Sequence, residues 1–189
     1  DDIMVIYHKV CDPLWHKVES GEITLKELQG LRWHRIFKEL GFDYNPEIDY
    51  EQRFREYLVQ NAFAVEGSLE LLKYLSKKYT ICAASNSFYA QQLKRLAICG
   101  FDKYISQVFT SNEIGAEKPS AEFYNACLER LSNPPKSEVI MIGDSLTADV
   151  GGAYNFGIRS VWFNKYNRTA EKVPADYTVF RLKEIMEIL

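Results

Sequence analysis

Short apolar stretches alternate with helical patterns over the last two thirds of the chain, and this alternation constrains the fold more than any other feature. From Val65 onward, runs such as "TICAAS" and "EVIMIG" are separated by segments whose leucines and aromatics recur at helical spacing. Consecutive parallel strands need a crossover connection, which is usually a helix. The pattern therefore predicts an α/β fold with a doubly wound, mainly parallel sheet. We expect strands at residues 79–84, 107–111, 138–143, 160–163 and 177–180.

The beginning of the chain contains helical patterns and no strand pattern. The Asp12–Pro13 step predicts that a helix restarts there, because Asp favours the N-cap and Pro the first helical position, and Gly21 predicts its end. The "TLKE" stretch at Thr24–Glu27 has the form of a capping box, which predicts a new helix that ends at Gly41. We expect a helical subdomain over residues 1–64 and an α/β core over residues 65–189.

Composition and charge limit the classes of partner. The 189 residues are 47% hydrophobic and 26% charged, and 23 basic against 26 acidic residues give a net charge of -3 without a Lys/Arg stripe. This argues against a nucleic acid polymer as partner. No apolar stretch is long enough to span a bilayer and the N-terminus does not resemble a signal peptide, so we expect a cytoplasmic protein without a membrane partner. The scattered cysteines indicate buried thiols rather than disulfides, and nothing in the sequence indicates an oligomeric state.

Polar side chains with coherent chemistry follow three of the predicted strands. Ser85 and Asn86 follow the first strand, Lys118 follows the second, and Asp144 and Asp149 follow the third. In open α/β sheets, functional groups gather at the carboxyl ends of the strands. A hydroxyl and an amide can donate to phosphoryl oxygens, a lysine supplies positive charge, and aspartates offer the oxygen ligands that Mg²⁺ prefers. The set predicts a phosphoryl-transfer site with Asp144 as metal ligand and Asp149 beside it.

Each of these residues also has a simpler interpretation. A Ser-Asn pair after a strand is often a turn or a helix cap, an isolated lysine is often solvated, and an Asp at a strand end is often an N-cap. The histidines are not at zinc-ligand spacing, and the aromatic residues of the segment 1–64 lie at helical spacing, which favours core packing over nucleobase stacking. The histidines are His8, His16 and His34, and the aromatics are Trp15, Trp33 and Phe37. The occurrence of three polar strand ends in order favours a functional site.

The motifs resemble those of a known superfamily. "ASNS", "GAEKPS" and "IGDSLTAD" are similar to the second, third and fourth motifs of the haloacid dehalogenase (HAD) superfamily of hydrolases, which are mostly Mg²⁺-dependent phosphatases. The resemblance implies that Ser85 and Asn86 bind the phosphoryl group, that Lys118 stabilises an aspartyl-phosphate intermediate, and that Asp144 and Asp149 form the Mg²⁺ site. The segment 1–64 is similar to the helical cap of that superfamily. The run "GDSLTADVGGAYNFGIRSVWFN" is close to 5′-nucleotidases that act on pyrimidine nucleoside monophosphates, so a small phosphorylated substrate is implied.

One superfamily motif is missing from the sequence. The first motif, DxDx(T/V), carries the nucleophilic Asp on the first strand, and residues 1–189 contain no Asp-x-Asp spacing. We therefore expect the nucleophile, the first and central strand and part of the cap to lie upstream of Asp1. Two alternatives stay open, a metal-independent 2-haloacid dehalogenase and a catalytically silent binding module. The acidic pair Asp144/Asp149 argues against the dehalogenase.

Overall fold

The computed structural model describes residues 2–169 and 174–189. The chain forms two compact units, Asp1–Asn61 and Ala62–Leu189, so the division lies three residues before the predicted one at residue 64. Across the described residues, no helix has both the length and the apolar character that a membrane crossing requires.

The first unit consists of three helices, α1 (Asp2–Glu19), α2 (Leu25–Leu40) and α3 (Tyr50–Gln60). Helices α1 and α2 pack through a small apolar core (Val10, Cys11, Leu14, Val18, Leu28 and Ile36). The guanidinium of Arg32 on α2 forms a bidentate ion pair with the Glu51 carboxylate on α3, and the Trp33 indole N–H donates to the same carboxylate at 3.0 Å. This network joins α2 to α3. Its charges are mutually compensated, as buried ions must be.

Helix boundaries in the first unit agree with the sequence at three points and differ at one. Both hydrogen bonds of the Thr24–Glu27 capping box are present, and Gly21 (φ 77°) and Gly41 (φ 71°) follow helix ends. Pro13, however, does not restart a helix, because α1 runs through it without interruption. Pro13 is exposed while the flanking Cys11 and Leu14 are buried, so water can reach the main-chain carbonyl that proline leaves unpaired. The prediction of a restart was wrong.

The second unit contains all five strands of the described residues. The strands are β1 (Cys82–Ser85), β2 (Gln107–Thr110), β3 (Ile140–Gly143), β4 (Arg159–Phe163) and β5 (Tyr177–Val179). The α-helices are α4 (Ser68–Leu75), α5 (Tyr89–Ile98), α6 (Ser111–Ile114), α7 (Ala121–Arg130), α8 (Gly152–Phe156) and α9 (Ile185–Ile188), with 3₁₀ turns η1 (Asp102–Tyr104), η2 (Lys136–Glu138) and η4 (Leu182–Glu184) and the π-helical turn η3 (Leu146–Gly151). The sequence predicted one helix over 147–156, where the chain forms η3 followed by α8.

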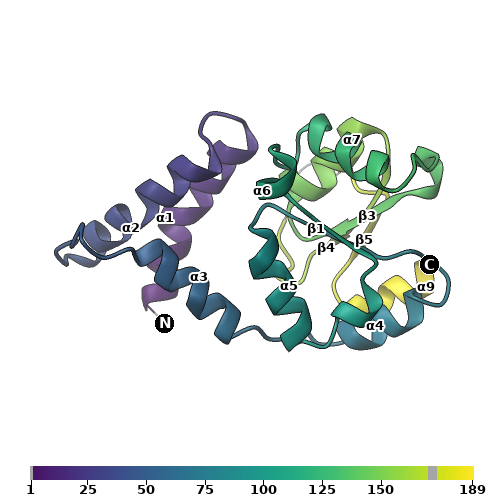
Figure 1. The fold of residues 1–189 in the computed structure, drawn as a ribbon, viewed down its shortest axis with the longest axis horizontal. Helices are drawn as coiled ribbons and strands as arrows, with labels where there is room; N and C mark the ends of the chain where they lie inside the picture. The colour runs from purple at the N-terminus through teal and green to yellow at the C-terminus, as the bar shows by residue number, and fades with distance from the viewer. Residues whose placement is uncertain (1, 170–173) are drawn as a thin grey trace. The chain divides into compact units, whose positions relative to one another are not determined.

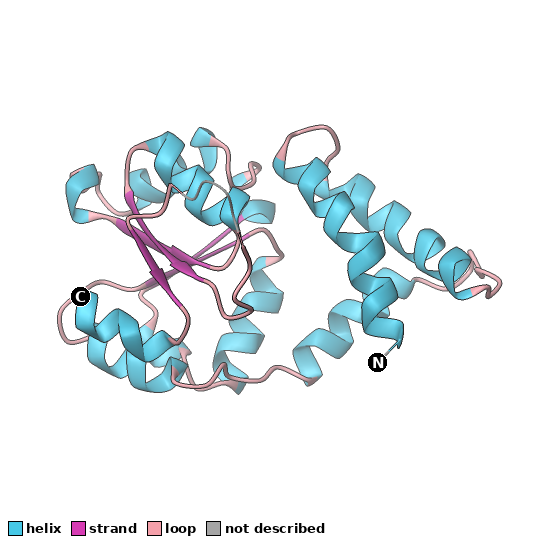
Figure 2. Ribbon diagram, turned by 180° about the vertical axis from the view of Figure 1, so that it is seen from behind, coloured by secondary structure: helices cyan, strands magenta, loops and turns pink. Residues whose placement is uncertain are grey.

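Every strand pairing is parallel, which confirms the predicted α/β fold, but the strands form two sheets. One has the order β1-β2 and the other β3-β4-β5. Helices cover both faces, α7 and α8 on one side and α4 and α9 on the other (Figures 1 and 2). Within the described residues, β1 and β3 share no hydrogen-bonded ladder.

The burial of the strands differs in a way that matches the division. In β4, the central residues Ser160, Val161 and Trp162 are buried. In β3, which has the most apolar sequence, all four residues are only half-buried, and the same holds for all four residues of β1. β1 and β3, one at the edge of each sheet, are therefore both partly exposed.

Candidate active site

The side chain of Asn86 joins the loop that follows β1 to the loop between α6 and α7. Its Oδ1 accepts from the main-chain N–H of Lys118 at 2.8 Å, and its Nδ2 donates to the main-chain carbonyl of Lys118 at 2.9 Å. This two-point contact fixes the backbone from which the Lys118 side chain extends. The predicted phosphate donor Asn86 thus has a positioning task, which uses one of the two hydrogens of its amide nitrogen.

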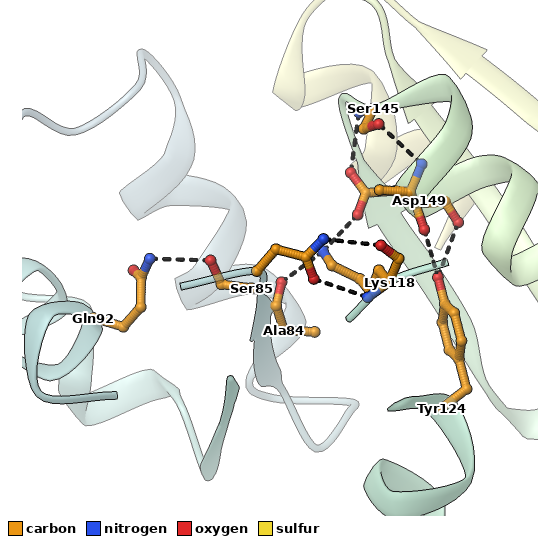
Figure 3. Close-up of polar contacts among 9 residues, drawn as sticks. Ala84, Ser85, Gln92, Lys118, Tyr124, Ser145 and Asp149 are labelled. Atoms are coloured by element: carbon orange, nitrogen blue, oxygen red, sulfur yellow. Dashed lines mark hydrogen bonds and ion pairs between the residues drawn. The ribbon is translucent and has the colours of Figure 1, made fainter. Parts of the chain in front are cut away.

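Ser85, the last residue of β1, is held by a glutamine that the sequence did not single out. The Nε2 of Gln92 on α5 donates to Ser85 Oγ at 3.0 Å (Figure 3). It also donates to Ser87 Oγ at 2.9 Å. Ser85 is the acceptor in this contact, so its own hydroxyl hydrogen is free to donate to a further group. Gln92 lies in α5, the helix that follows β1, and the fold places its side chain at the end of the strand.

The Lys118 side chain is buried and bridges the carboxyl ends of the two sheets. Its Nζ donates to the carbonyl of Ala84 in β1 at 2.9 Å and to Oδ1 of Asp149 in η3 at 2.6 Å (Figure 3). The lysine and aspartate side chains are only 8% and 7% exposed. Ion pairs so far from water persist only when both charges are compensated. The structure therefore brings together two of the predicted site residues, Lys118 and Asp149.

The Asp149 carboxylate is also held from the other side. Its Oδ2 accepts from the main-chain N–H of Ser145 at 3.0 Å. The Tyr124 hydroxyl lies within hydrogen-bond distance of the main-chain carbonyls of Ala148 (2.9 Å) and Asp149 (3.3 Å). Burial and the nearby negative charge of Asp149 raise the pKa of Tyr124 well above its usual range. Its hydroxyl therefore stays protonated and serves as a donor to the π-helical turn. π-Helical turns occur often at functional sites.

Gly143 explains how the Asp149 carboxylate fits against β3. A Cβ at this position would lie 2.1 Å from Asp149 Oδ2, a separation that no real pair of atoms of this kind adopts. The strand must therefore end in glycine for the carboxylate to lie where it accepts from Ser145 and pairs with Lys118. The sequence does not indicate this requirement, because it predicts Gly143 only as the last residue of a strand.

Asp144 has a different environment from Asp149. Its main-chain carbonyl accepts from the indole N–H of Trp162 at 3.3 Å, while its side chain is 63% exposed and its Oδ2 lies 4.0 Å from the Nζ of Lys165. Trp162 is buried in β4, opposite Gly143 in the register of the sheet. The backbone of Asp144 is thus fixed and its carboxylate open to a ligand. Neither Trp162 nor Lys165 was predicted as a site residue.

The donor set fits a hard divalent cation. Mg²⁺ keeps several waters and is bound by one or two carboxylates together with substrate phosphate. The open carboxylate of Asp144 can serve as such a ligand, whereas both oxygens of Asp149 already accept hydrogen bonds from Lys118 and Ser145. Within residues 2–169 and 174–189, no three His, Cys, Asp or Glu side chains gather as a ready-made metal cluster. A cation here would be held mainly by Asp144, water and substrate.

Comparisons with known proteins identify the family. The model of the haloacid dehalogenase-like hydrolases matches residues 1–163. Pyrimidine 5′-nucleotidase PynA of Streptococcus pneumoniae is 33% identical, covering 93% of this chain and 75% of the relative, and pyrimidine 5′-nucleotidase YjjG of Escherichia coli is 28% identical, covering 97% and 80%. A crystal structure of the HAD-hydrolase YfnB of Bacillus subtilis bound to magnesium has a TM-score of 0.89 at 27% identity, covering 100% of this chain and 82% of that chain. The chain therefore belongs to the haloacid dehalogenase-like hydrolase family.

Proposed function

We propose that the chain is the greater part of a Mg²⁺-dependent phosphomonoester hydrolase for a small phosphorylated metabolite, with nucleoside 5′-monophosphates as the leading class. The observation that carries the proposal is the buried ammonium of Lys118 at the carboxyl ends of β1 and β3, held by Ala84 and Asp149. A fixed cation in a poorly solvated site stabilises the charge of a transferring phosphoryl group. The names of PynA and YjjG support the substrate class.

The phosphoryl group has two donors in addition to Lys118. The Ser85 hydroxyl can donate because it only accepts from Gln92, and the second amide hydrogen of Asn86 is not needed for its contact with Lys118. Both residues lie at the end of β1, and Asn86 is bonded to the backbone of the lysine. Ser85, Asn86 and Lys118 therefore form the proposed phosphate-binding group.

The two aspartates have separate tasks in this proposal. Asp144 holds Mg²⁺ with its open carboxylate, and Asp149 fixes Lys118 and the start of η3 from a position beside the metal site. When bound, Mg²⁺ neutralises charge on the phosphoryl oxygens and orients the group for in-line attack. The magnesium in the YfnB structure supports the choice of cation.

We further propose that the nucleophile is an Asp on a parallel strand that lies between β1 and β3. The separate sheets and the half-buried residues of both strands support this placement. The carboxyl end of such a strand would lie next to Lys118. There its Asp would attack phosphorus, break the P–O bond to the substrate alcohol, which leaves with a proton, and form an aspartyl-phosphate that water then hydrolyses to Asp and inorganic phosphate. The printed residues contain no Asp-x-Asp pair to supply this nucleophile.

The test compares residues 1–189 with a chain that also carries the nucleophile strand. The longer chain should release phosphate from UMP and p-nitrophenyl phosphate when Mg²⁺ is present, and the variants Asp144→Ala and Lys118→Met should lose at least about a hundredfold in kcat/KM. Residues 1–189 alone should show no turnover. Turnover by residues 1–189 that depends on Asp144 would refute the proposed position of the nucleophile. Metal-independent halide release from 2-chloropropionate would favour the dehalogenase.

A further inference from the structure

The loop that follows β4 is held in one conformation by a buried asparagine. Asn164 is 4% exposed, its Nδ2 donates to the carbonyl of Arg168 at 2.9 Å, and its Oδ1 accepts from the N–H of Arg168 at 2.8 Å. Its own main-chain N–H donates to Val179 in β5 at 2.8 Å. The ends of the loop 164–168 are therefore tied to each other and to the sheet, at the carboxyl edge where Asp144 follows the neighbouring strand.

This loop carries a lysine that is directed at Asp144. The Nζ of Lys165 lies 4.0 Å from Asp144 Oδ2 and 4.7 Å from the centre of the Tyr166 ring, whose exposed face also lies near the Arg168 guanidinium. One third of the Lys165 side chain is exposed and most of the Asp144 carboxylate is open to water. A pair so exposed contributes little to folding stability. Stability therefore gives no account of why the fold fixes a loop that brings this ammonium to the carboxylate.

We propose that Lys165 is a further phosphate-binding residue, which Asp144 holds near the site until a divalent cation takes the carboxylate. This inference rests on the proposed phosphohydrolase function. A divalent cation at the Asp144 carboxylate neutralises its charge and repels the nearby Lys165 ammonium, so binding of the cation weakens the attraction that holds Lys165 at Asp144. The flexible four-carbon stem of the lysine then allows its ammonium to reach an anionic oxygen of the phosphoryl group bound beside the cation. Because Asn164 fixes the backbone of the loop, the Lys165 ammonium stays close to the Asp144 carboxylate.

Two effects of opposite sign follow from this arrangement. Without Lys165, the Asp144 carboxylate loses a competing positive charge, so a divalent cation should bind more tightly. Phosphate should bind more weakly, because one of its positive partners is gone. Removal of a unit charge a few ångströms away in a solvent-exposed setting corresponds to a change of about fivefold in either affinity. A residue with only a structural role would shift both affinities in the same direction.

The experiment measures Mn²⁺ affinity by the electron paramagnetic resonance signal of the free ion, and inorganic phosphate affinity in saturating Mg²⁺ by calorimetry. The variants are Lys165→Met, the conservative Lys165→Arg, and Lys183→Met, which removes the same charge from the exposed surface of η4. Lys165→Met should bind Mn²⁺ about fivefold more tightly and phosphate about fivefold more weakly. Lys165→Arg and Lys183→Met should stay within about twofold of the parent chain.

The outcomes separate this proposal from the one on which it rests. If Lys165→Met changes neither affinity, or weakens both together, Lys165 has no role at the phosphate and the inference is overturned. If Asp144→Ala leaves Mn²⁺ affinity unchanged, the metal site itself is misplaced and the proposed function fails first. Unchanged hydrogen exchange of the Arg168 amide, which donates to Asn164 Oδ1, verifies that the loop keeps its conformation in Lys165→Met.

Discussion

At the scale of single residues, the two aspartates that follow β3 differ in exposure and therefore in what they can do. Asp149 is enclosed by Lys118, Ser145 and the end of β3, so its charge is compensated within the protein. Asp144 is open to water on a backbone that Trp162 holds. Spacing alone places both residues near the strand end, whereas the contacts show that Asp149 is bonded within the protein and that the Asp144 carboxylate is open to water.

The buried pair of Lys118 and Asp149 should be coupled in stability. Lys118→Met leaves the Asp149 carboxylate buried without its cation, so the free energy of unfolding should fall by about 3–5 kcal/mol. Adding Asp149→Asn to that variant removes the unpaired charge, so the double variant should be less destabilised than the sum of the single effects. Urea denaturation followed by circular dichroism measures all three. Additive losses in the free energy of unfolding would show that Lys118 and Asp149 are not energetically coupled.

The close approach of β3 to Asp149 should make Gly143 intolerant of a side chain. Gly143→Ala places a Cβ where Asp149 Oδ2 now lies, so the carboxylate must leave Lys118 or the strand must shift. We expect a loss of about 2–4 kcal/mol in the free energy of unfolding, as for other buried overpacking that also breaks a polar network. Gly30→Ala is the matched control, because a Cβ on that glycine of α2 meets nothing within 4 Å. It should stabilise by about 0.5–1 kcal/mol, and equal losses in both variants would contradict the steric argument.

At the scale of elements, local capping signals are reliable only where no packing opposes them. The Thr24 box and the two glycines end or begin helices as their chemistry predicts. The Asp12–Pro13 signal fails because Cys11, Leu14 and Val18 continue one buried stripe on both sides of the proline. Burial of that stripe against α2 outweighs the loss of one solvent-facing hydrogen bond.

The capping box of α2 should make part of the stability of the first unit depend on pH. Hydrogen bonds from the main-chain N–H and the hydroxyl of Thr24 lower the pKa of Glu27 from its ordinary value of 4.5. The folded state thus favours the ionised Glu27 carboxylate. The stability that this carboxylate adds is complete above the pKa of Glu27 in the unfolded chain, and it is lost as pH falls through the lower pKa of Glu27 in the folded chain. Thr24→Ala should lower unfolding stability by about 1 kcal/mol near pH 7.

Thermal unfolding between pH 7 and pH 3 tests this dependence. The difference between the parent chain and Thr24→Ala should shrink below pH 4.5 as Glu27 becomes protonated. Thr24→Ser, which keeps the hydroxyl, should follow the parent chain throughout. A difference that does not vary with pH would mean that the hydrogen bond from the Thr24 hydroxyl to Glu27 contributes nothing to the cap.

At the scale of the whole molecule, the strand and helix alternation was enough to predict the parallel α/β fold and the sheet edge at which the candidate site residues lie. It could not predict that Asn86 would clamp Lys118, because the two residues lie 32 positions apart and meet only through the fold. It also could not distinguish η3 from an ordinary helix, since the π-turn depends on Tyr124 and Ser145 binding the Asp149 segment. The residue types at the strand ends could be predicted from the sequence, but the residues that position their side chains could not.

The division into two sheets makes a prediction about backbone exchange. The Ile81 carbonyl accepts from the main-chain N–H of Ser106, the residue before β2, whereas the Ala84 carbonyl accepts from Lys118 Nζ. Because alternate residues of a strand direct their N–H and C=O groups to opposite sides, the Ala84 amide faces away from β2 and the Ala83 amide faces β2. In residues 1–189, the Ala84 amide should therefore exchange with deuterium at least about tenfold faster than that of Ala83.

A chain that also carries the proposed central strand should reverse this contrast. A new parallel neighbour would pair with the open edge of β1, so exchange at Ala84 should slow to the rate of Ala83 while Ala83 itself changes little. Residue-resolved nuclear magnetic resonance on both chains measures the two amides in one experiment. Fast exchange at Ala84 in the longer chain would show that the added strand does not pair with β1, and the proposed position of the nucleophile between β1 and β3 would be wrong.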